Sequence, residues 1–222
     1  MATDDFTGAS QDLPDHNGNW KNAVGGTSPI DVDCETDGSG KAVANLISSR
    51  GGNYWSDGGQ DGDSWSYVHL NGLVNASGFI GVTARMGAEN EGILARTRDG
   101  EDSSIDDVII RMDDAYDQVL SFINTYDLTT GDCYLGIRIN GSDEPEVYVE
   151  DASNSETATG NAIGSIITGG FPGIVSAPNN EAGSGEFAGW GDDLSALKGG
   201  GAATPKGPLG LPFYGPFGGP IG

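Results

Sequence analysis

The chain has 222 residues and a formal net charge of −23, from 33 acidic and 10 basic side chains. So acidic a surface repels phosphate backbones and anionic lipid head groups, and we therefore expect neither nucleic-acid nor membrane-surface binding. The length suits one well-buried β domain, and no apolar run approaches the about 18 residues of a membrane span.

Short alternating or apolar runs recur along the chain between clusters of Gly, Asp, Asn and Ser, which predicts an all-β fold. The predicted strands cover residues 30–33, 42–48, 64–70, 79–86, 92–97, 107–112, 119–126, 133–139, 146–150, 173–177 and 186–190. A short helix is predicted over residues 158–167. We expect two antiparallel sheets packed face to face.

Two acidic clusters precede or connect the early strands. Acidic side chains at alternating positions before Gly38, and a second group in the loop SDGGQDGDS, offer the oxygen ligands that calcium prefers. The first cluster lacks EF-hand spacing, because the twelfth position counted from Asp33 is Ala44, and Asp–Gly loops also form plain turns. Calcium is thus the one cofactor suggested, and its candidate ligands are Asp33, Glu35, Asp37, Asp57, Asp61 and Asp63.

Aromatic residues flank the second acidic loop. Tyr54 and Trp55 precede it, and Trp65 and Tyr67 follow it two residues apart. Exposed aromatic faces beside Asp and Asn side chains are suited to stacking and hydrogen bonding a sugar ring, so these four residues are candidate carbohydrate ligands. The alternative is that Trp65 and Tyr67 are core or rim residues of a strand.

The segment 133–150 shows its faces most clearly. Leu135, Ile137 and Ile139 alternate with polar or aromatic residues, which predicts that these three point into the core. After a turn, Val147 and Val149 are predicted to point inward as well. The segment 79–86 alternates less cleanly, which suggests a strand covered on both sides.

The sequence resembles the concanavalin A-like, laminin-G-like jelly roll over about residues 4–194. The resemblance lies in DDFTG with a downstream Trp20, in FIGVTARM, GILARTR, DVIIRM and YLGIRINGSDEPEVYVED, and in GGFPGIVSAPNN and the closing EFAGWGDDL. It implies that the opening and closing strands lie side by side, which would bring Asp4 near Asp192 and make Phe6 and Trp190 packing residues.

Glucan-cleaving enzymes also have the fold that this resemblance implies, and they need clustered carboxylates on one strand. The closest match here is Glu144, Glu146, Glu150 and Asp151, but Pro145 and the isolated valines do not reproduce the enzymes' spacing. We therefore expect no enzyme and no catalytic residue.

The last segment, 199–222, has nine glycines, five prolines and no acidic residue. Glycine and proline at this density prevent independent folding, yet the segment is too apolar for an ordinary linker. We therefore divide the chain into a jelly-roll body, 1–198, and an extended C-terminal docking tail, 199–222. The predicted docking residues are Leu209, Leu211, Phe213, Tyr214, Phe217 and Ile221.

The sequence as a whole favours a structural protein of a virus particle, because small phage virion proteins with a jelly-roll body and a Gly/Pro-rich tail resemble it. This implies a capsid decoration, cement or head-fibre subunit whose partners are the major capsid protein, other virion proteins or further copies of itself. No secretory signal is seen in MATDDFTGAS, so we expect assembly in a host cytoplasm. The alternative function is a carbohydrate-binding module or adhesin that recognises a host-surface glycan.

The two cysteines, Cys34 and Cys133, do not form a metal motif, because they are far apart in the chain. In a reducing compartment we expect two small buried side chains. The alternative is a disulfide that forms after release from the cell.

Overall fold

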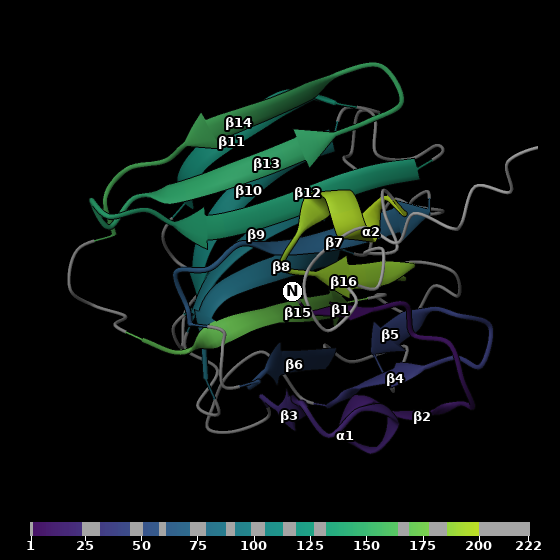
Figure 1. Ribbon diagram of the computed structural model, residues 1–222. Helices are drawn as coiled ribbons and strands as arrows, with labels where there is room; N and C mark the ends of the chain where they lie inside the picture. The colour runs from purple at the N-terminus through teal and green to yellow at the C-terminus, as the bar shows by residue number, and fades with distance from the viewer. Residues whose placement is uncertain are drawn as a thin grey trace, which may run out of the picture.

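The structure is a computed structural model, which describes residues 2–23, 32–44, 51–57, 61–71, 79–87, 92–98, 105–112, 119–126, 132–163, 169–177 and 186–199. Within these ranges the strands form two large antiparallel sheets and one small sheet (Figure 1). The prediction of an all-β, two-sheet sandwich is confirmed, and the small sheet adds to it. No helix in these ranges is long and apolar enough to cross a membrane.

Both large sheets combine strands from the early and late parts of the chain. The six-stranded sheet has the order β1 (Thr3–Asp4), β16 (Gly189–Gly191), β7 (Ser66–Asn71), β12 (Asp132–Ile139), β13 (Pro145–Glu150), β14 (Ser155–Thr159). The seven-stranded sheet has the order β11 (Val119–Tyr126), β10 (Ile105–Met112), β9 (Gly92–Arg98), β8 (Phe79–Met86), β15 (Phe171–Ala177), β6 (Gly51–Trp55), β3 (Trp20–Asn22). The small sheet has the order β2 (Gln11–Asp12), β4 (Cys34–Thr36), β5 (Ala42–Ala44).

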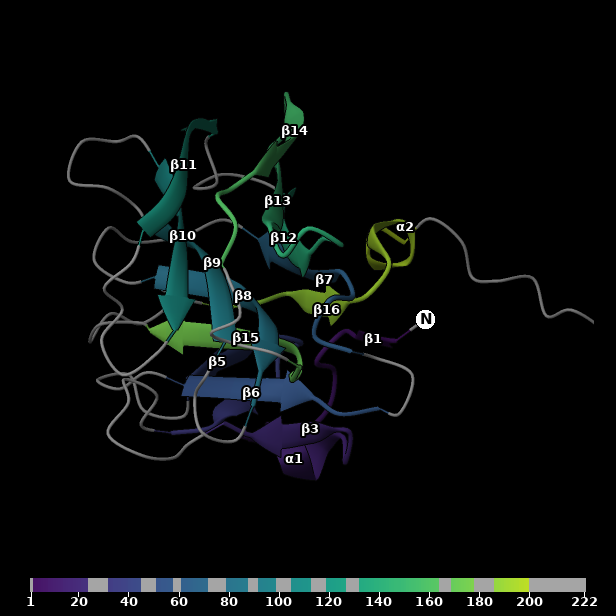
Figure 2. The same cartoon turned by 90° about the vertical axis from the view of Figure 1, so that its left-hand side faces the viewer.

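Two short helices complete the described elements, α1 (Leu13–His16) and α2 (Leu194–Leu197). Figure 2 shows the two large sheets face to face, with α2 on the outer side of the six-stranded sheet. The helix contacts β16 and β7 there. The helix therefore covers the part of this outer face that β16 and β7 form.

The core lies between the two large sheets and follows the predicted alternation. Leu135, Ile137 and Ile139 of β12 and Val147 and Val149 of β13 are all buried in one hydrophobic cluster. The β12–β13 hairpin is in register, with Leu135 opposite Val149 and Ile137 opposite Val147. The face assignments made from the sequence are confirmed for this hairpin.

The opening and closing strands lie side by side, as the resemblance implied. Asp4 of β1 is the partner of Trp190 in β16, and Thr3 is the partner of Gly191. Trp190 is fully buried and its ring lies 5.0 Å from that of Trp20 and 4.9 Å from that of Trp55. Three tryptophans from separate strands thus form the aromatic centre of the core.

Residues 158–167 were predicted to form a helix, and that prediction is wrong where the structure describes them. Ala158 lies in β14, where it is the strand partner of Val147. Residues 160–163 are not helical, and 164–168 lie outside the described residues. The pairing with β13 supplies backbone hydrogen bonds that the local helical tendency of this stretch cannot match.

The strand β8 is covered on both faces, as the sequence suggested, but Met86 does not share the face of Ile80 and Val82. Ile80 and Val82 belong to the main core, whereas Met86 packs in a second cluster on the other side of the sheet. The residue before it, Arg85, has a φ of 53°, which interrupts the strand's period of two. The sequence pattern could not show that interruption.

Candidate functional site

The outer face of the six-stranded sheet collects aromatic and charged side chains from three neighbouring strands. The pairing of β12 with β7 and β13 sets them in rows: Tyr134 lies beside His69, and Gly136 lies between Tyr67 and Tyr148. Their neighbours along each strand point into the core, so the period of two places these side chains on the outer side. We call this face the aromatic face.

A glycine makes room for the centre of the aromatic face. A Cβ atom at Gly136 would lie 2.3 Å from Cδ1 of Tyr67, so the Tyr67 ring occupies the space above that glycine. The ring also stacks on Trp65, with 4.9 Å between centroids, and meets Tyr148 edge-on at 5.9 Å. Burial in this setting raises the pKa of the Tyr67 hydroxyl well above its usual range. Trp65 and Tyr148 keep partly exposed rings.

Charged side chains border the aromatic face as pairs. The Arg138 guanidinium lies 4.9 Å from the Trp65 ring centroid, and its Nε donates a 2.6 Å hydrogen bond to Glu146. Asn140 donates a further hydrogen bond to Glu146 at 3.2 Å. The hydrogen bond from Arg138 lowers the pKa of Glu146 below its usual value. A general acid for glycoside hydrolysis has a raised pKa, so the shift at Glu146 is in the opposite direction.

The other carboxylates from the predicted enzyme-like set are also engaged. Glu144 accepts a hydrogen bond from Asn140 at 3.1 Å, and Glu150 accepts from the Tyr148 hydroxyl and from Lys198. Asp151 accepts the backbone N–H groups of Ser153 and Asn154 in a turn.

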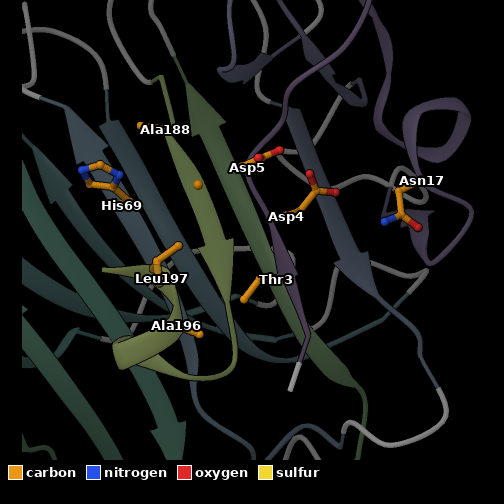
Figure 3. A pocket seen from close by; sticks show the side chains of 9 residues that line it. Thr3, Asp4, Asp5, Asn17, His69, Ala188, Ala196 and Leu197 are labelled. Carbon is orange, nitrogen blue, oxygen red and sulfur yellow. The ribbon is translucent and has the colours of Figure 1, made fainter. Parts of the chain in front are cut away.

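A pocket of about 400 Å³ opens beside the aromatic face, between β1, β16 and α2. Figure 3 shows His69 across the pocket from Asp4 and Asp5. His69 also stacks on Tyr134, at 4.9 Å between ring centroids, and its Nε2 lies 2.9 Å from Asp132. The residues that line the pocket include Thr3, Asp4, Asp5, Asn17, His69 and Leu197.

The two acidic residues of the pocket differ in their surroundings. Asp4 is buried, and its carboxylate accepts the Trp20 indole N–H and the Phe6 backbone N–H, each at 2.9 Å. Asp5 is exposed, and hydrogen bonds from the Thr7 side chain and backbone lower the pKa of its carboxyl. Asp4 therefore holds the fold together, and Asp5 presents a negative charge to the pocket.

The structure separates the four aromatic residues proposed from the sequence. Trp65 and Tyr67 lie together on the aromatic face. Trp55 is only 3% exposed inside the tryptophan cluster, so its proposed role as a sugar-stacking surface is corrected to a core role. Tyr54 lies in the other sheet and stacks on Phe171, with ring centroids 5.6 Å apart.

The acidic clusters are not drawn together as ligand sets. Among the described residues, no three His, Cys, Asp or Glu side chains gather to hold a metal ion. Asp37 and Asp61 cap local turns by accepting hydrogen bonds from Ser39 and Ser64. Asp33 accepts a hydrogen bond from Asn53 at 2.8 Å, and Asp63 forms an ion pair with Arg85 at 2.6 Å. The other two candidates are Glu35 and Asp57.

Burial and a nearby carboxylate shift the pKa values of two residues of the first cluster. Desolvation is the main cause that raises the pKa values of Asp33 and Glu35, and the nearby Asp12 carboxylate adds to it. Cys34, between them, has a buried thiol whose pKa is raised by burial, and Cys133 is likewise buried and outside any disulfide. These cysteines act as small core residues in this structure.

Sequence reasoning missed part of the aromatic face. The alternation in 133–150 did place Tyr134, Arg138 and Tyr148 outward, but it could not show which strand lies next to β12. Lys198, which approaches Tyr134 and Tyr148, follows the unpredicted helix α2. The predicted docking residues, Leu209, Leu211, Phe213, Tyr214, Phe217 and Ile221, lie outside the described residues.

Solved structures with similar folds place the chain in a known architecture. A legume lectin-like domain from Entamoeba histolytica matches with a TM-score of 0.52 and 15% identity, over 82% of this chain and 95% of that one. The CBM2 module of the evolved Dit of Lactobacillus casei BL23 phage J-1 matches with a TM-score of 0.50 and 11% identity, over 85% and 92%. A GH43 protein from Bacillus licheniformis matches with a TM-score of 0.52 and 13% identity, over 85% of this chain.

The chain spans only 38% of that GH43 protein's length. No protein-family model matches the chain, and no curated protein matches it in sequence. Identities of this size show the fold alone. The fold is the concanavalin A-like jelly roll shared by lectin-like domains, carbohydrate-binding modules and glycoside hydrolases.

Proposed function

We propose that this protein is a non-enzymatic carbohydrate-binding module that holds a glycan against the aromatic face. The observation that carries this proposal is the partly exposed ring of Trp65, which lies beside the Arg138–Glu146 pair and Asn140. An aromatic ring next to fixed donors and acceptors offers both stacking and hydrogen bonds to a pyranose. The fold likeness to a lectin-like domain and to a carbohydrate-binding module supports the same function.

The charge of the protein restricts the kind of glycan that we expect it to bind. The net charge of −23 repels polyanionic sugars, and the basic groups of the aromatic face are already paired with Glu146 and Glu150. Neutral glycans therefore fit better than sulfated or uronic-acid chains. The same pairing argues against hydrolysis, because the carboxylates near the face accept hydrogen bonds in place of donating a proton.

A glycan array followed by titration tests this function. We expect the protein to bind neutral oligosaccharides and Trp65→Ala to weaken that binding by about tenfold, which corresponds to about 1.4 kcal/mol of lost stacking. The matched control is Tyr54→Ala, which also removes a stacked ring but from the other sheet. Equal affinities of the Trp65→Ala and wild-type proteins would refute the aromatic face as the glycan site.

A virion role is the second candidate, and the two functions are compatible. The Gly/Pro-rich composition of residues 199–222 suits an extended segment that gains order in a partner's groove. The chain's fold is also similar to a module of a phage Dit protein. In this proposal the body displays the glycan site on a phage particle assembled in the host cytoplasm, and the tail docks on the major capsid protein or another virion protein.

Deletion of residues 208–222 tests the docking tail. Large apolar side chains each gain about 1.5 to 3 kcal/mol when a partner buries them, so Phe213→Ala with Phe217→Ala should also weaken docking. We expect both variants to fold but to be lost from the particle or oligomer, measured as occupancy after purification of the particle. Wild-type occupancy of the deleted form would place attachment on the body instead.

A further inference from the structure

A lysine of the chain itself is surrounded by aromatic rings and a carboxylate on the aromatic face. Nζ of Lys198 lies 5.0 Å from the ring centroid of Tyr134 and 5.9 Å from that of Tyr148. It also donates a hydrogen bond to Oε2 of Glu150, which the Tyr148 hydroxyl shares. Two ring faces and a carboxylate are the groups that select an ammonium ion. We call Tyr134, Tyr148 and Glu150 the cage.

The cage belongs to the rigid part of the molecule. Tyr134 and Glu150 are directly opposed partners on β12 and β13, and Tyr148 is opposite Gly136 on the same strand pair. His69 stacks on Tyr134, and Tyr67 contacts the edge of Tyr148. These contacts hold the two rings, while Glu150 is held by its hydrogen bond from the Tyr148 hydroxyl as well as by Lys198.

The occupant, in contrast, comes from a short and partly exposed element. Lys198 follows α2, a four-residue helix with no buried residue, and its own side chain is 31% exposed. The cage is thus partly open to solvent, and a short helix contributes little to hold the lysine in place. An ammonium group from a ligand can therefore take the position of Nζ while the end of α2 moves away.

We propose that the cage is a subsite for the ammonium group of an amino sugar, and that Lys198 occupies it when no ligand is bound. The inference rests on the proposed glycan-binding function, because the cage is part of the aromatic face and its Tyr148 contacts Tyr67. A free amino group on a pyranose ring is the cation that this site would meet within a glycan. N-acetylation removes the charge and with it the attraction to the rings and to Glu150.

The test compares a glucosamine trisaccharide with its N-acetylated form by calorimetric titration of the full chain. Lys198→Ala vacates the cage, so we expect it to bind the glucosamine trisaccharide about tenfold tighter than wild type. The N-acetylated trisaccharide should bind both proteins equally. Adding Glu150→Gln to Lys198→Ala should remove the gain, because an amide carries no charge to attract the ammonium.

Lys41→Ala is the matched control. The Lys41–Glu186 pair has side chains that are 35% and 21% exposed, against 31% and 22% for Lys198 and Glu150, but no aromatic ring from the described part of the chain lies over Lys41. Its loss should leave affinity for both trisaccharides unchanged. An equal gain in Lys41→Ala, or none in Lys198→Ala, overturns the proposal.

A second measurement needs no substitution. Tetramethylammonium chloride added to the wild-type protein should shift the ring resonances of Tyr134 and Tyr148 in NMR spectra, whereas the same concentration of sodium chloride should not. No shift of these resonances overturns the cage. Binding of tetramethylammonium without binding of any sugar supports the cage and refutes the glycan function. Equal binding of both trisaccharides by every variant supports the glycan function and refutes the cage as an ammonium subsite.

Discussion

Replacing Asp4 with alanine is expected to lower the free energy of unfolding by about 3 to 5 kcal/mol, the size seen when a buried charged partner is removed. The Asp4 side chain is 4% exposed, and it joins three segments of the chain. Its Oδ2 accepts the Trp20 indole N–H, and its Oδ1 accepts the Phe6 backbone N–H and lies 2.9 Å from His16 Nε2. Alanine leaves the Trp20 donor without this acceptor inside the core.

Asp4 also holds an unusual backbone conformation. Phe6 has a φ of 54°, a region that residues with a Cβ atom enter rarely, and its ring is fully buried 6.1 Å from that of Trp20. The hydrogen bond from Phe6 N–H to Asp4 stabilises the turn that directs this ring inward. The variant therefore loses core packing together with its hydrogen bonds.

Urea denaturation of the full chain measures the effect of Asp4→Ala, and Asp5→Ala is the control. Asp5 is exposed, and within the described residues its side chain accepts hydrogen bonds from the nearby Thr7, so its loss should change stability by about 0.5 kcal/mol or less. A change below about 1 kcal/mol for Asp4→Ala would mean that the aromatic centre holds without this carboxylate.

Local alternation was sufficient to predict which side chains of β12 and β13 face the core. Leu135 and Val149 are buried because a period of two fixes the face of every residue once one face is apolar. The adjacency of β1 and β16 came from the resemblance and is confirmed by the pairing of Asp4 with Trp190. These features depend on the strand itself or on a shared topology.

The aromatic face could not be derived in the same way, because it depends on register between strands distant in sequence. Tyr67 reaches Gly136 across 69 positions of the chain only because β7 pairs with β12. Trp55 and Trp65 have similar local surroundings, rich in Gly, Asp and Ser, yet one is in the core and the other is partly exposed. The residues next to a tryptophan in the sequence do not show whether its ring packs between the two sheets or lies on an outer face.

In the proposed function, Gly136→Ala should weaken glycan binding more than about tenfold, because the space above Gly136 is needed for the Tyr67 ring. The added Cβ would lie 2.3 Å from Cδ1 and 2.6 Å from Cε1 of Tyr67, so the ring has to leave its place. Tyr67 is held there by the stacked Trp65 and by Tyr148. Moving the Tyr67 ring therefore displaces the surface on which the sugar is expected to stack.

The stability of Gly136→Ala combines two opposing effects. Overpacking is expected to cost about 1 to 3 kcal/mol, while alanine restricts the unfolded chain and recovers about 0.4 to 1 kcal/mol. Gly141→Ala is the control for the second effect, because a Cβ at Gly141, in the turn after β12, meets no atom within 4 Å. Adding Tyr67→Ala to Gly136→Ala removes the clash and should restore part of the stability while binding stays lost. Wild-type affinity in Gly136→Ala would show that the glycan site lies away from Tyr67.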